Sequence, residues 1–228
     1  MKPGTLTGII GVNGSGKSTL LRTLGKLQPS LSGSIDIHGV PIAKHTPKAL
    51  ATAISLVLTE TVPAKNLTVA ELISLGRQPY TNWIGALSLT DKEIISRAMA
   101  MVELNELQQK KCFELSDGQL QKVMIARALA QDTDIMLLDE PTTHLDMYHK
   151  VQVLKLLQTI AQSTQKTILF TTHEIGLALQ LCDAMLIIDH KTNPFGTPAT
   201  LIKQQHITNL FPQDILYFDA NTGAFKIP

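Results

Sequence analysis

Nine consecutive residues near the beginning of the sequence have the types and spacing that bind a polyphosphate. Residues 11–19 read Gly-Val-Asn-Gly-Ser-Gly-Lys-Ser-Thr and fit the pattern G-x-x-x-x-G-K-[ST]. Glycines let the backbone turn tightly, so that successive N–H groups face one anion. Lys17 adds a mobile positive charge for the outer phosphates, and the Ser18 hydroxyl is a ligand for Mg²⁺. We therefore expect phosphate contacts from Gly11, Asn13, Gly14, Ser15, Gly16, Lys17, Ser18 and Thr19.

Two adjacent carboxylates, Asp139 and Glu140, directly follow the apolar run 135–138. The end of a strand is where an α/β sheet presents its ligand groups. The two can divide the chemistry: Asp139 would hold Mg²⁺ through water, with Ser18 as a direct ligand, and Glu140 would polarise the attacking water. The alternative is a solvated acidic turn, but the phosphate loop elsewhere in the chain favours the catalytic interpretation.

His173 follows the expected strand 166–171 in the phrase Thr171-Thr172-His173-Glu174. A lone histidine is more often structural or simply exposed. Because this one stands at the end of a core strand, it can reach the same ligand edge of the sheet. We therefore expect His173 to contact the γ-phosphate.

A second potential anion site precedes the helical run 120–129. Ser116 can cap that helix, and Gly118 keeps its first turn unobstructed. One interpretation is a plain helix cap. The other is an anion site that contacts a nucleotide held by another subunit, because one phosphate loop already serves one nucleotide.

A parallel sheet is needed to bring these groups together. Strand-like apolar runs occupy residues 5–10, 34–37, 54–58, 135–138, 166–171 and 184–188. Between them, helical spacing is seen at Leu20, Leu21, Leu24 and Leu27, and again at Val151, Leu154, Leu157 and Ile160. Strands that alternate with helices predict an α/β fold with a mostly parallel sheet.

The pattern changes between about residue 61 and residue 127, where helices and loops replace strands. Capping boxes at Thr68 and Thr90 predict helices that run through Leu75 and to about Leu104. We expect one domain over residues 1–228, with a core of about 1–60 and 128–228 and an inserted helical lobe of about 61–127. A C-terminal hairpin is expected over 215–227.

Composition excludes several classes of protein. Of 228 residues, 44% are hydrophobic, which allows a sizeable core, and 20 Lys and Arg balance 19 Asp and Glu, which does not favour nucleic-acid binding. Cys112 and Cys182 lie far apart without metal-ligand neighbours and are expected to be reduced thiols in a cytosolic protein. No run is long enough to span a membrane, and there is no signal-peptide pattern. We therefore expect a soluble chain whose membrane role, if any, comes through a partner.

The ordered set of motifs resembles the nucleotide-binding subunit of an ABC transporter over nearly the whole chain. Gly11 to Thr19 is similar to the Walker A motif, and Leu115 to Gln119 to the LSGGQ signature, with Asp117 where glycine is usual. Residues 135–140 resemble Walker B with its catalytic glutamate, residues 143–146 the D-loop, and His173 the switch histidine. The resemblance implies a P-loop NTPase fold of the ABC ATPase type that hydrolyses ATP with Mg²⁺, with Glu140 and His173 as catalytic residues.

The resemblance also implies partners. Two copies would form a head-to-tail dimer with two ATP molecules between them, so that the Walker motifs of one copy face the signature of the other. In addition to the phosphate loop, the implied nucleotide contacts are Ser116, Gly118, Gln119 and Asp146. The helical lobe would transmit closure of the dimer to a polytopic membrane permease, with a periplasmic or surface substrate-binding protein as an indirect partner. The chain would then lie at the cytoplasmic face of the inner or plasma membrane.

A finer resemblance points to importers of the iron-siderophore, haem or cobalamin type. It rests on four phrases: residues 57–60, 76–85, 116–118 and 141–146. We expect a ferric siderophore as the cargo. Tyr80 and Trp83 could equally be aromatic residues that pack within the lobe, so we assign them no ligand contact. The alternatives are a soluble ABC ATPase in assembly work such as iron–sulfur cluster building, and a truncated product without activity.

The sequence departs from the family pattern in two places. Where relatives carry a glutamine that touches Mg²⁺ and the permease interface, this chain has Thr59, followed by Glu60. Relatives also have additional strands and an adenine-stacking aromatic before the phosphate loop, whereas residues 1–10 contain no aromatic residue. The N-terminal strands therefore look truncated: the start site is wrong, the chain is a fragment, or adenine is bound less tightly.

Overall fold

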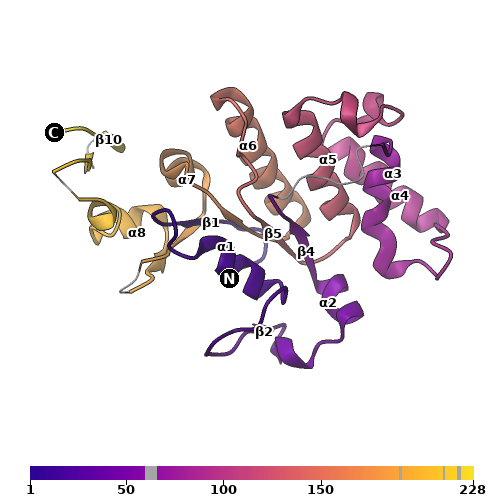
Figure 1. Cartoon of the computed structure of the whole chain (residues 1–228), viewed down its shortest axis with the longest axis horizontal. Coiled ribbons are helices and arrows are strands. Elements are labelled where there is room, and N and C mark those ends of the chain that lie inside the picture. The colour runs from indigo at the N-terminus through magenta and orange to yellow at the C-terminus, as the bar shows by residue number, and fades with distance from the viewer. Residues whose placement is uncertain (60–65, 190–191, 213, 220–221) are drawn as a thin grey trace.

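A mixed sheet with the strand order β4-β5-β6-β1-β7-β8 organises the chain (Figure 1). The computed structural model describes residues 1–59, 66–189, 192–212, 214–219 and 222–228. The six strands are β1 (Leu6–Ile10), β4 (Ile54–Val57), β5 (Ile135–Leu138), β6 (Thr167–Thr171), β7 (Ala184–Ile187) and β8 (Phe195–Gly196). All neighbours pair in parallel except β7 and β8, which are antiparallel. The expected mostly parallel α/β sheet is confirmed.

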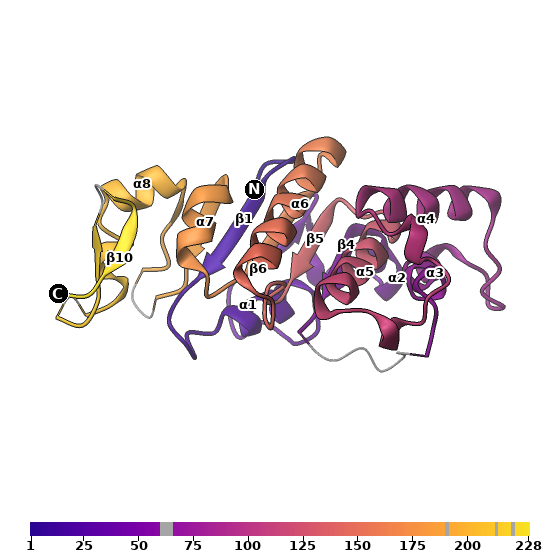
Figure 2. The ribbon, with the colours of Figure 1, turned by 90° about the horizontal axis from the view of Figure 1, so that it is seen from above.

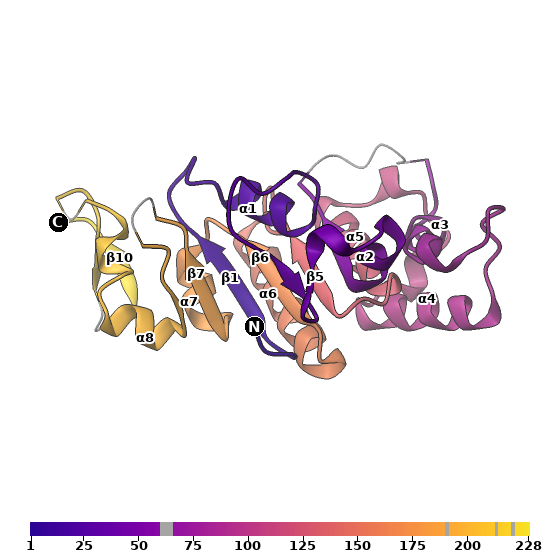
Figure 3. The same ribbon diagram turned by 90° about the horizontal axis from the view of Figure 1, so that it is seen from below.

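Helices cover both faces of this sheet because its central strands are apolar on both sides. Helices α6 (Met147–Thr164) and α7 (Ile175–Leu181) lie on one face, as the view from above shows (Figure 2). Helix α1 (Lys17–Leu24) lies on the other, in front of the strands in the view from below (Figure 3). Within β1, Ile10 joins the large core cluster on the first face and Ile9 the smaller one on the second.

Three helices gather at one end of the sheet: α3 (Val69–Ser74), α4 (Leu89–Met101) and α5 (Asp117–Ala130). Both α3 and α4 pack against α5. Gly76 allows the turn after α3 to lie directly on α5, since a Cβ atom there would stand 2.2 Å from the Arg127 carbonyl oxygen. The proposed boundary of this lobe at residue 61 falls on residues outside the described part of the chain.

The start of α4 corrects one sequence prediction. Thr90 is not the N-cap; Ser88 is, and its hydroxyl accepts the Asp91 N–H at 3.1 Å. Asp91 is the reciprocal partner, because its carboxylate accepts from the Ser88 N–H and also from Arg77 at 2.8 Å. The helix therefore begins earlier than the Thr90 capping box predicts. The box at Thr68 is confirmed.

The remaining elements lie at the edges. The expected strand at 34–37 pairs only with its neighbour, as the hairpin of β2 (Asp36–Ile37) and β3 (Val40–Pro41), and does not join the main sheet. The C-terminal hairpin is confirmed as β9 (Tyr217–Asp219) and β10 (Ala224–Lys226). Two further helices are α2 (Pro47–Ala53) and α8 (Pro198–Lys203). Short 3-10 helices cover Ile42–Lys44, Leu75–Tyr80, Asn105–Leu107, Cys112–Glu114 and Thr208–Leu210.

Two other features bear on the predictions from composition. Cys112 and Cys182 are buried free thiols, and burial raises the pKa of Cys182 to about 12. Within the described ranges, no helix has the length and hydropathy to cross a membrane.

Candidate functional site

The phosphate loop runs between the end of β1 and the start of α1. Gly16 forms the N-cap of α1 with φ +98°, and Gly14 has φ +76°, conformations that disfavour other residues. At Gly11, a Cβ atom would stand 2.6 Å from the Ile188 carbonyl oxygen, so the loop also passes too close to β7 for a side chain. The glycines of the motif are therefore required by the geometry, and the first N–H groups of α1 are free to face an anion.

Lys17 is folded back across this loop. Its Nζ donates to the carbonyl oxygens of Gly11 at 3.1 Å and Val12 at 3.3 Å, and the residue is buried. Burial lowers the pKa of Lys17, against the opposing effect of Glu140 and then Asp139. The amino group is thus held at the mouth of the loop, beside two carboxylates and within reach of an incoming phosphate.

Ser18 and Asp139 meet at the start of α1 and the end of β5. The Ser18 hydroxyl donates to Asp139 Oδ1 at 2.9 Å. A hydroxyl and a carboxylate are hard oxygen ligands of the kind that Mg²⁺ prefers. Within the described residues, no group of three or more His, Cys, Asp or Glu side chains is placed to hold a metal. The residues present fit Mg²⁺ bound together with a nucleotide, as the sequence predicts.

Glu140 adopts the left-handed backbone conformation, with φ +48°. This conformation is uncommon for residues other than glycine and needs support from its surroundings. The support comes from Thr171 on β6, whose hydroxyl accepts the Glu140 N–H at 2.8 Å. The turn takes the Glu140 side chain away from the buried strand and toward the phosphate loop.

Both carboxylate oxygens of Glu140 are engaged. His173 Nε2 lies 2.7 Å from Oε1, and the Thr143 hydroxyl donates to Oε2 at 3.0 Å. The predicted convergence of Glu140 and His173 at one edge of the sheet is therefore seen. Thr143 is an addition, since the sequence placed it only in the D-loop phrase.

These residues surround one open cavity of about 320 Å³. Its lining is Asn13, Gly14, Gly16, Lys17, Ser18, Thr19, Glu140 and His173. Of the residues proposed to contact the nucleotide, Gly11 and Ser15 belong to the phosphate loop but are not among the residues that line the cavity. Asp139 lies deeper and is buried.

The residues of the signature phrase lie elsewhere. Ser116 caps α5 in a reciprocal box with Gln119, so the plain capping role is present. A separate cavity of about 200 Å³ opens there, lined by Ser116, Gly118, Gln119, Lys122 and His149 among others. Ser116, Gly118 and Gln119 do not line the phosphate-loop cavity of their own chain.

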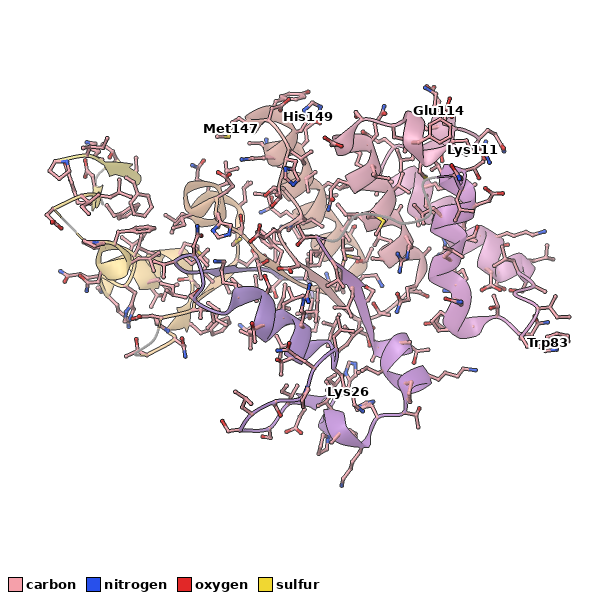
Figure 4. All side chains as sticks on the ribbon, viewed as in Figure 1. Lys26, Trp83, Lys111, Glu114, Met147 and His149 are labelled. Atoms are coloured by element: carbon pink, nitrogen blue, oxygen red, sulfur yellow. The ribbon has the colours of Figure 1, made fainter. Side chains whose placement is uncertain are left out.

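Asp146 is the N-cap of α6 and is not among the residues that line either cavity, although its partner His149 lines the second. Its carboxylate accepts the His149 N–H at 2.9 Å and lies 2.8 Å from His149 Nδ1. His149 in turn lies against the signature, because a Cβ on Gly118 would stand 3.3 Å from its ring. In Figure 4, Met147 and His149 project from the start of α6 beside the lobe.

The two aromatic residues of the lobe, Tyr80 and Trp83, differ in how they pack. Tyr80 packs on Arg77, whose guanidinium carbon lies 3.9 Å from the ring centroid. Trp83 is 94% exposed and stands at the outer end of the lobe (Figure 4), so it does not pack within it. Thr59 also has a partner: its hydroxyl donates to the Asp139 carbonyl oxygen at 3.0 Å. Glu60 lies outside the described residues.

Sequence reasoning missed Thr171 as a residue of the site. Its hydroxyl donates to Asp139 Oδ1 at 2.7 Å while accepting from Glu140, which joins the two carboxylate residues. The available signal was a polar residue at the last position of an apolar strand, at the edge where ligand groups gather.

Comparison with known proteins gives a consistent result. A family model described as ABC transporter matches residues 1–143. An uncharacterized ABC transporter ATP-binding protein of Methanocaldococcus jannaschii is 38% identical over 98% of this chain and 78% of its own length. A protein of Bacillus subtilis named as a siderophore transport system ATP-binding protein is 37% identical over 91% of this chain and 76% of its own length.

Solved structures agree in fold. A metal-chelate type ABC transporter in an inward-facing conformation superposes with a TM-score of 0.81 at 28% identity, over 92% of this chain and 80% of that one. A dimeric ATP-binding cassette in a post-hydrolysis state, bound to ADP and Pi, gives a TM-score of 0.73 at 27% identity, over 87% of each chain.

Proposed function

The chain belongs to the ABC transporter family and is an ATP-binding and ATP-hydrolysing subunit, and we propose that this subunit powers an importer of ferric siderophores. Haem and cobalamin are the other candidate cargoes. Two observations support a siderophore as the cargo: relatives are named for siderophore transport, and the sequence contains the phrases at residues 76–85 and 141–146. These relatives favour an importer over the alternative of a soluble assembly factor.

One observation carries the chemistry: the Glu140 carboxylate lies 2.7 Å from His173 Nε2 at the cavity that Lys17 and Ser18 line. In this arrangement Glu140 orients and polarises a water molecule for attack on the γ-phosphate, and His173 holds that carboxylate through Nε2. The same N–H would become the donor to the γ-phosphate oxygens once ATP is bound. Lys17 and the first N–H groups of α1 bind the outer phosphates. Ser18 and Asp139 would hold Mg²⁺, which supplies neutralisation of phosphate charge when bound.

The partners follow from what one chain lacks. The signature residues Ser116, Gly118 and Gln119 line a different cavity from the chain's own phosphate loop. We therefore propose that a second copy brings them to the nucleotide, with Asp146 at the same interface. The lobe then contacts a polytopic permease at the cytoplasmic face of the membrane, and a substrate-binding protein delivers cargo to that permease.

Reconstitution tests this function. The tagged chain is purified from detergent-solubilised membranes of its host, the co-purifying permease is placed in liposomes, and its substrate-binding protein is added. We expect ATP-dependent uptake of radiolabelled ferric siderophore, and none when the chain carries Glu140→Gln. Uptake of haem or cobalamin alone would change the cargo, and recovery of soluble partners only would overturn the importer proposal.

A further inference from the structure

A single peptide group links the two carboxylates of the site. The carbonyl of this peptide belongs to Asp139 and its N–H to Glu140. On one side, the carbonyl accepts from the Thr59 hydroxyl, just past the end of β4, at 3.0 Å. On the other side, the N–H donates to the Thr171 hydroxyl, at the end of β6, at 2.8 Å. The peptide is therefore held between threonine hydroxyls from the two strands that flank β5.

These side chains continue the sheet where its backbone ladder stops. Asp139 N–H still donates to the Val57 carbonyl oxygen at 2.8 Å, in ladder fashion. Beyond that point the chain turns at Glu140, with φ +48°, and the next backbone groups lose their partners on β4 and β6. Buried peptide groups need partners, so the two hydroxyls replace the missing ladder bonds and fix the plane of the peptide.

The Thr171 hydroxyl has no freedom in this arrangement. It carries one proton, which it donates to Asp139 Oδ1 at 2.7 Å, and it accepts from Glu140. Thr171 is fully buried, so water cannot replace it, whereas Thr59 is exposed. A hydroxyl fixed at both its proton and its lone pair sets the direction in which Glu140 leaves the strand.

We propose that Thr171, with Thr59 as the weaker second member, is a positioning residue for ATP hydrolysis: it holds the Asp139–Glu140 peptide so that the Glu140 carboxylate points at the phosphate-loop cavity. The proposal rests on the proposed role of Glu140 and adds no new step to the reaction. It also gives Thr59, at the position where the family resemblance led us to expect glutamine, a contact of its own within the site.

The test uses the full chain with Thr171→Val, which keeps the shape of the side chain and removes the hydroxyl. We expect kcat for ATP hydrolysis at saturating Mg²⁺ and ATP to fall by about 10- to 100-fold, because small misplacements of a catalytic group cost that much. The Kd for ATP should change by less than about threefold, since the phosphate loop is untouched. Thr171→Ser should restore most of the rate, and Thr59→Val should cost less than Thr171→Val.

Thr7→Val is the matched control. Thr7 is also a buried strand residue, but its hydroxyl has no hydrogen-bond partner within the described residues. We expect a rate near that of the parental chain. A second readout does not depend on activity: the Glu140 amide should exchange its hydrogen about tenfold faster or more in Thr171→Val, and at the parental rate in Thr171→Ser and Thr7→Val.

Several kinetic results would overturn the proposal: a parental kcat in Thr171→Val, a kcat in Thr171→Ser as low as in Thr171→Val, or an equal loss of kcat in Thr7→Val. An unchanged exchange rate of the Glu140 amide in Thr171→Val would also overturn it. So would a Thr171→Val defect that is confined to the affinity for Mg²⁺ or ATP. Failure of the proposed function looks different, because it appears as absent turnover or transport in the parental chain. The positioning proposal is judged by the ratio of each variant to that parent and by the amide exchange.

Discussion

Glu140 takes its position from hydrogen bonds with one neighbour in the chain, Thr143, and two distant residues, Thr171 and His173. Thr171 fixes its backbone, and His173 and Thr143 hold its two carboxylate oxygens. Each of these contacts is made at the open edge of the sheet, where a bound nucleotide would lie. The protein's own groups thus hold the residue in place, which is how a preorganised site avoids rearrangement during the reaction.

The first prediction at this scale concerns Glu140→Gln. The amide keeps the size of the side chain and a hydrogen bond to His173, but it cannot take a proton from water. We expect kcat to fall by about 10²- to 10⁴-fold, the usual contribution of a general base, with ATP binding retained. Single-turnover hydrolysis and a binding titration measure the two effects. Glu93→Gln, at an exposed position of α4, is the control, and hydrolysis near the parental rate in Glu140→Gln would remove the base role.

The second concerns Lys17→Ala. Loss of a charge-assisted hydrogen bond to phosphate costs about 1.5–3 kcal/mol, so we expect the Kd for ATP to rise by roughly 10- to 100-fold. Isothermal titration with a non-hydrolysable ATP analogue measures this change. Lys155→Ala, on the exposed side of α6, is the matched control and should leave the Kd unchanged. An unaltered Kd in Lys17→Ala would contradict the phosphate role.

At the scale of the element, the lobe depends on one buried charge pair. Arg77 donates to Asp91 at 2.8 Å and to the Ala130 carbonyl oxygen at 2.9 Å. These two bonds tie the turn after α3 to the start of α4 and to the end of α5. Hydrogen bonds from Ser88, and then from Arg77, lower the pKa of Asp91 from 3.8 to about 2. The pair closes the segment 78–90, which contains no charged residue and carries Trp83.

Asp91→Asn tests this pair. Removing one partner of a buried ion pair leaves the other uncompensated, so we expect a loss of about 3 kcal/mol in the free energy of unfolding at neutral pH. Because the folded pKa lies below the ordinary value, the contribution of Asp91 is present above about pH 4 and is lost as the pH falls toward about 2. The stability gap between parent and variant should therefore narrow in that range, as urea unfolding at several pH values would reveal.

Asp132→Asn is the control for the Asp91 experiment. Asp132 pairs with Lys166 at 3.5 Å, but its side chain is 57% exposed. Exposed pairs contribute about 1 kcal/mol or less, so little change is expected. Two results would show that the lobe does not depend on a buried ionised carboxylate. One is an equal loss of unfolding free energy in the two variants. The other is a difference in unfolding free energy between the parent and Asp91→Asn that stays constant down to pH 2.

At the scale of the whole molecule, the chain carries two separate cavities that the proposed dimer would bring together. One cavity contains the phosphate loop with Glu140 and His173, and the other lies at the start of α5 with Ser116 and His149. A head-to-tail pairing of two copies would bring these cavities together twice, which suits the twofold symmetry of most dimers.

The dimer is tested by light scattering in the Glu140→Gln background, in which bound ATP persists. We expect a monomer without nucleotide and a dimer with ATP. Addition of Ser116→Arg should keep ATP binding yet prevent the dimer, because the long side chain occupies the interface. Ser88→Arg removes an N-cap of the same kind in the lobe and should still permit it. A dimer that persists with Ser116→Arg would exclude the head-to-tail arrangement.

The sequence alone determined the chemistry and the class of fold. The glycine spacing of residues 11–19, the apolar run before Asp139 and the histidine after β6 each follow from local rules, since phosphate loops and buried strands need particular residues at short range. The same local rules gave the parallel sheet and the capping box at Thr68. At Thr90 the wrong box was chosen, because the equally local pair Ser88 and Asp91 caps α4 two residues earlier.

Only the tertiary structure decided which groups meet. Thr171 lies 31 residues from Glu140 in the chain, yet parallel pairing of β5 and β6 sets them side by side. The same holds for Thr59 and Asp139 across β4 and β5, and for the separation of the Ser116 cavity from the phosphate loop. Strand order is a property of the whole sheet and leaves no trace in local spacing, so the positions of Thr171 and Thr59 against the catalytic carboxylates became visible only with the fold.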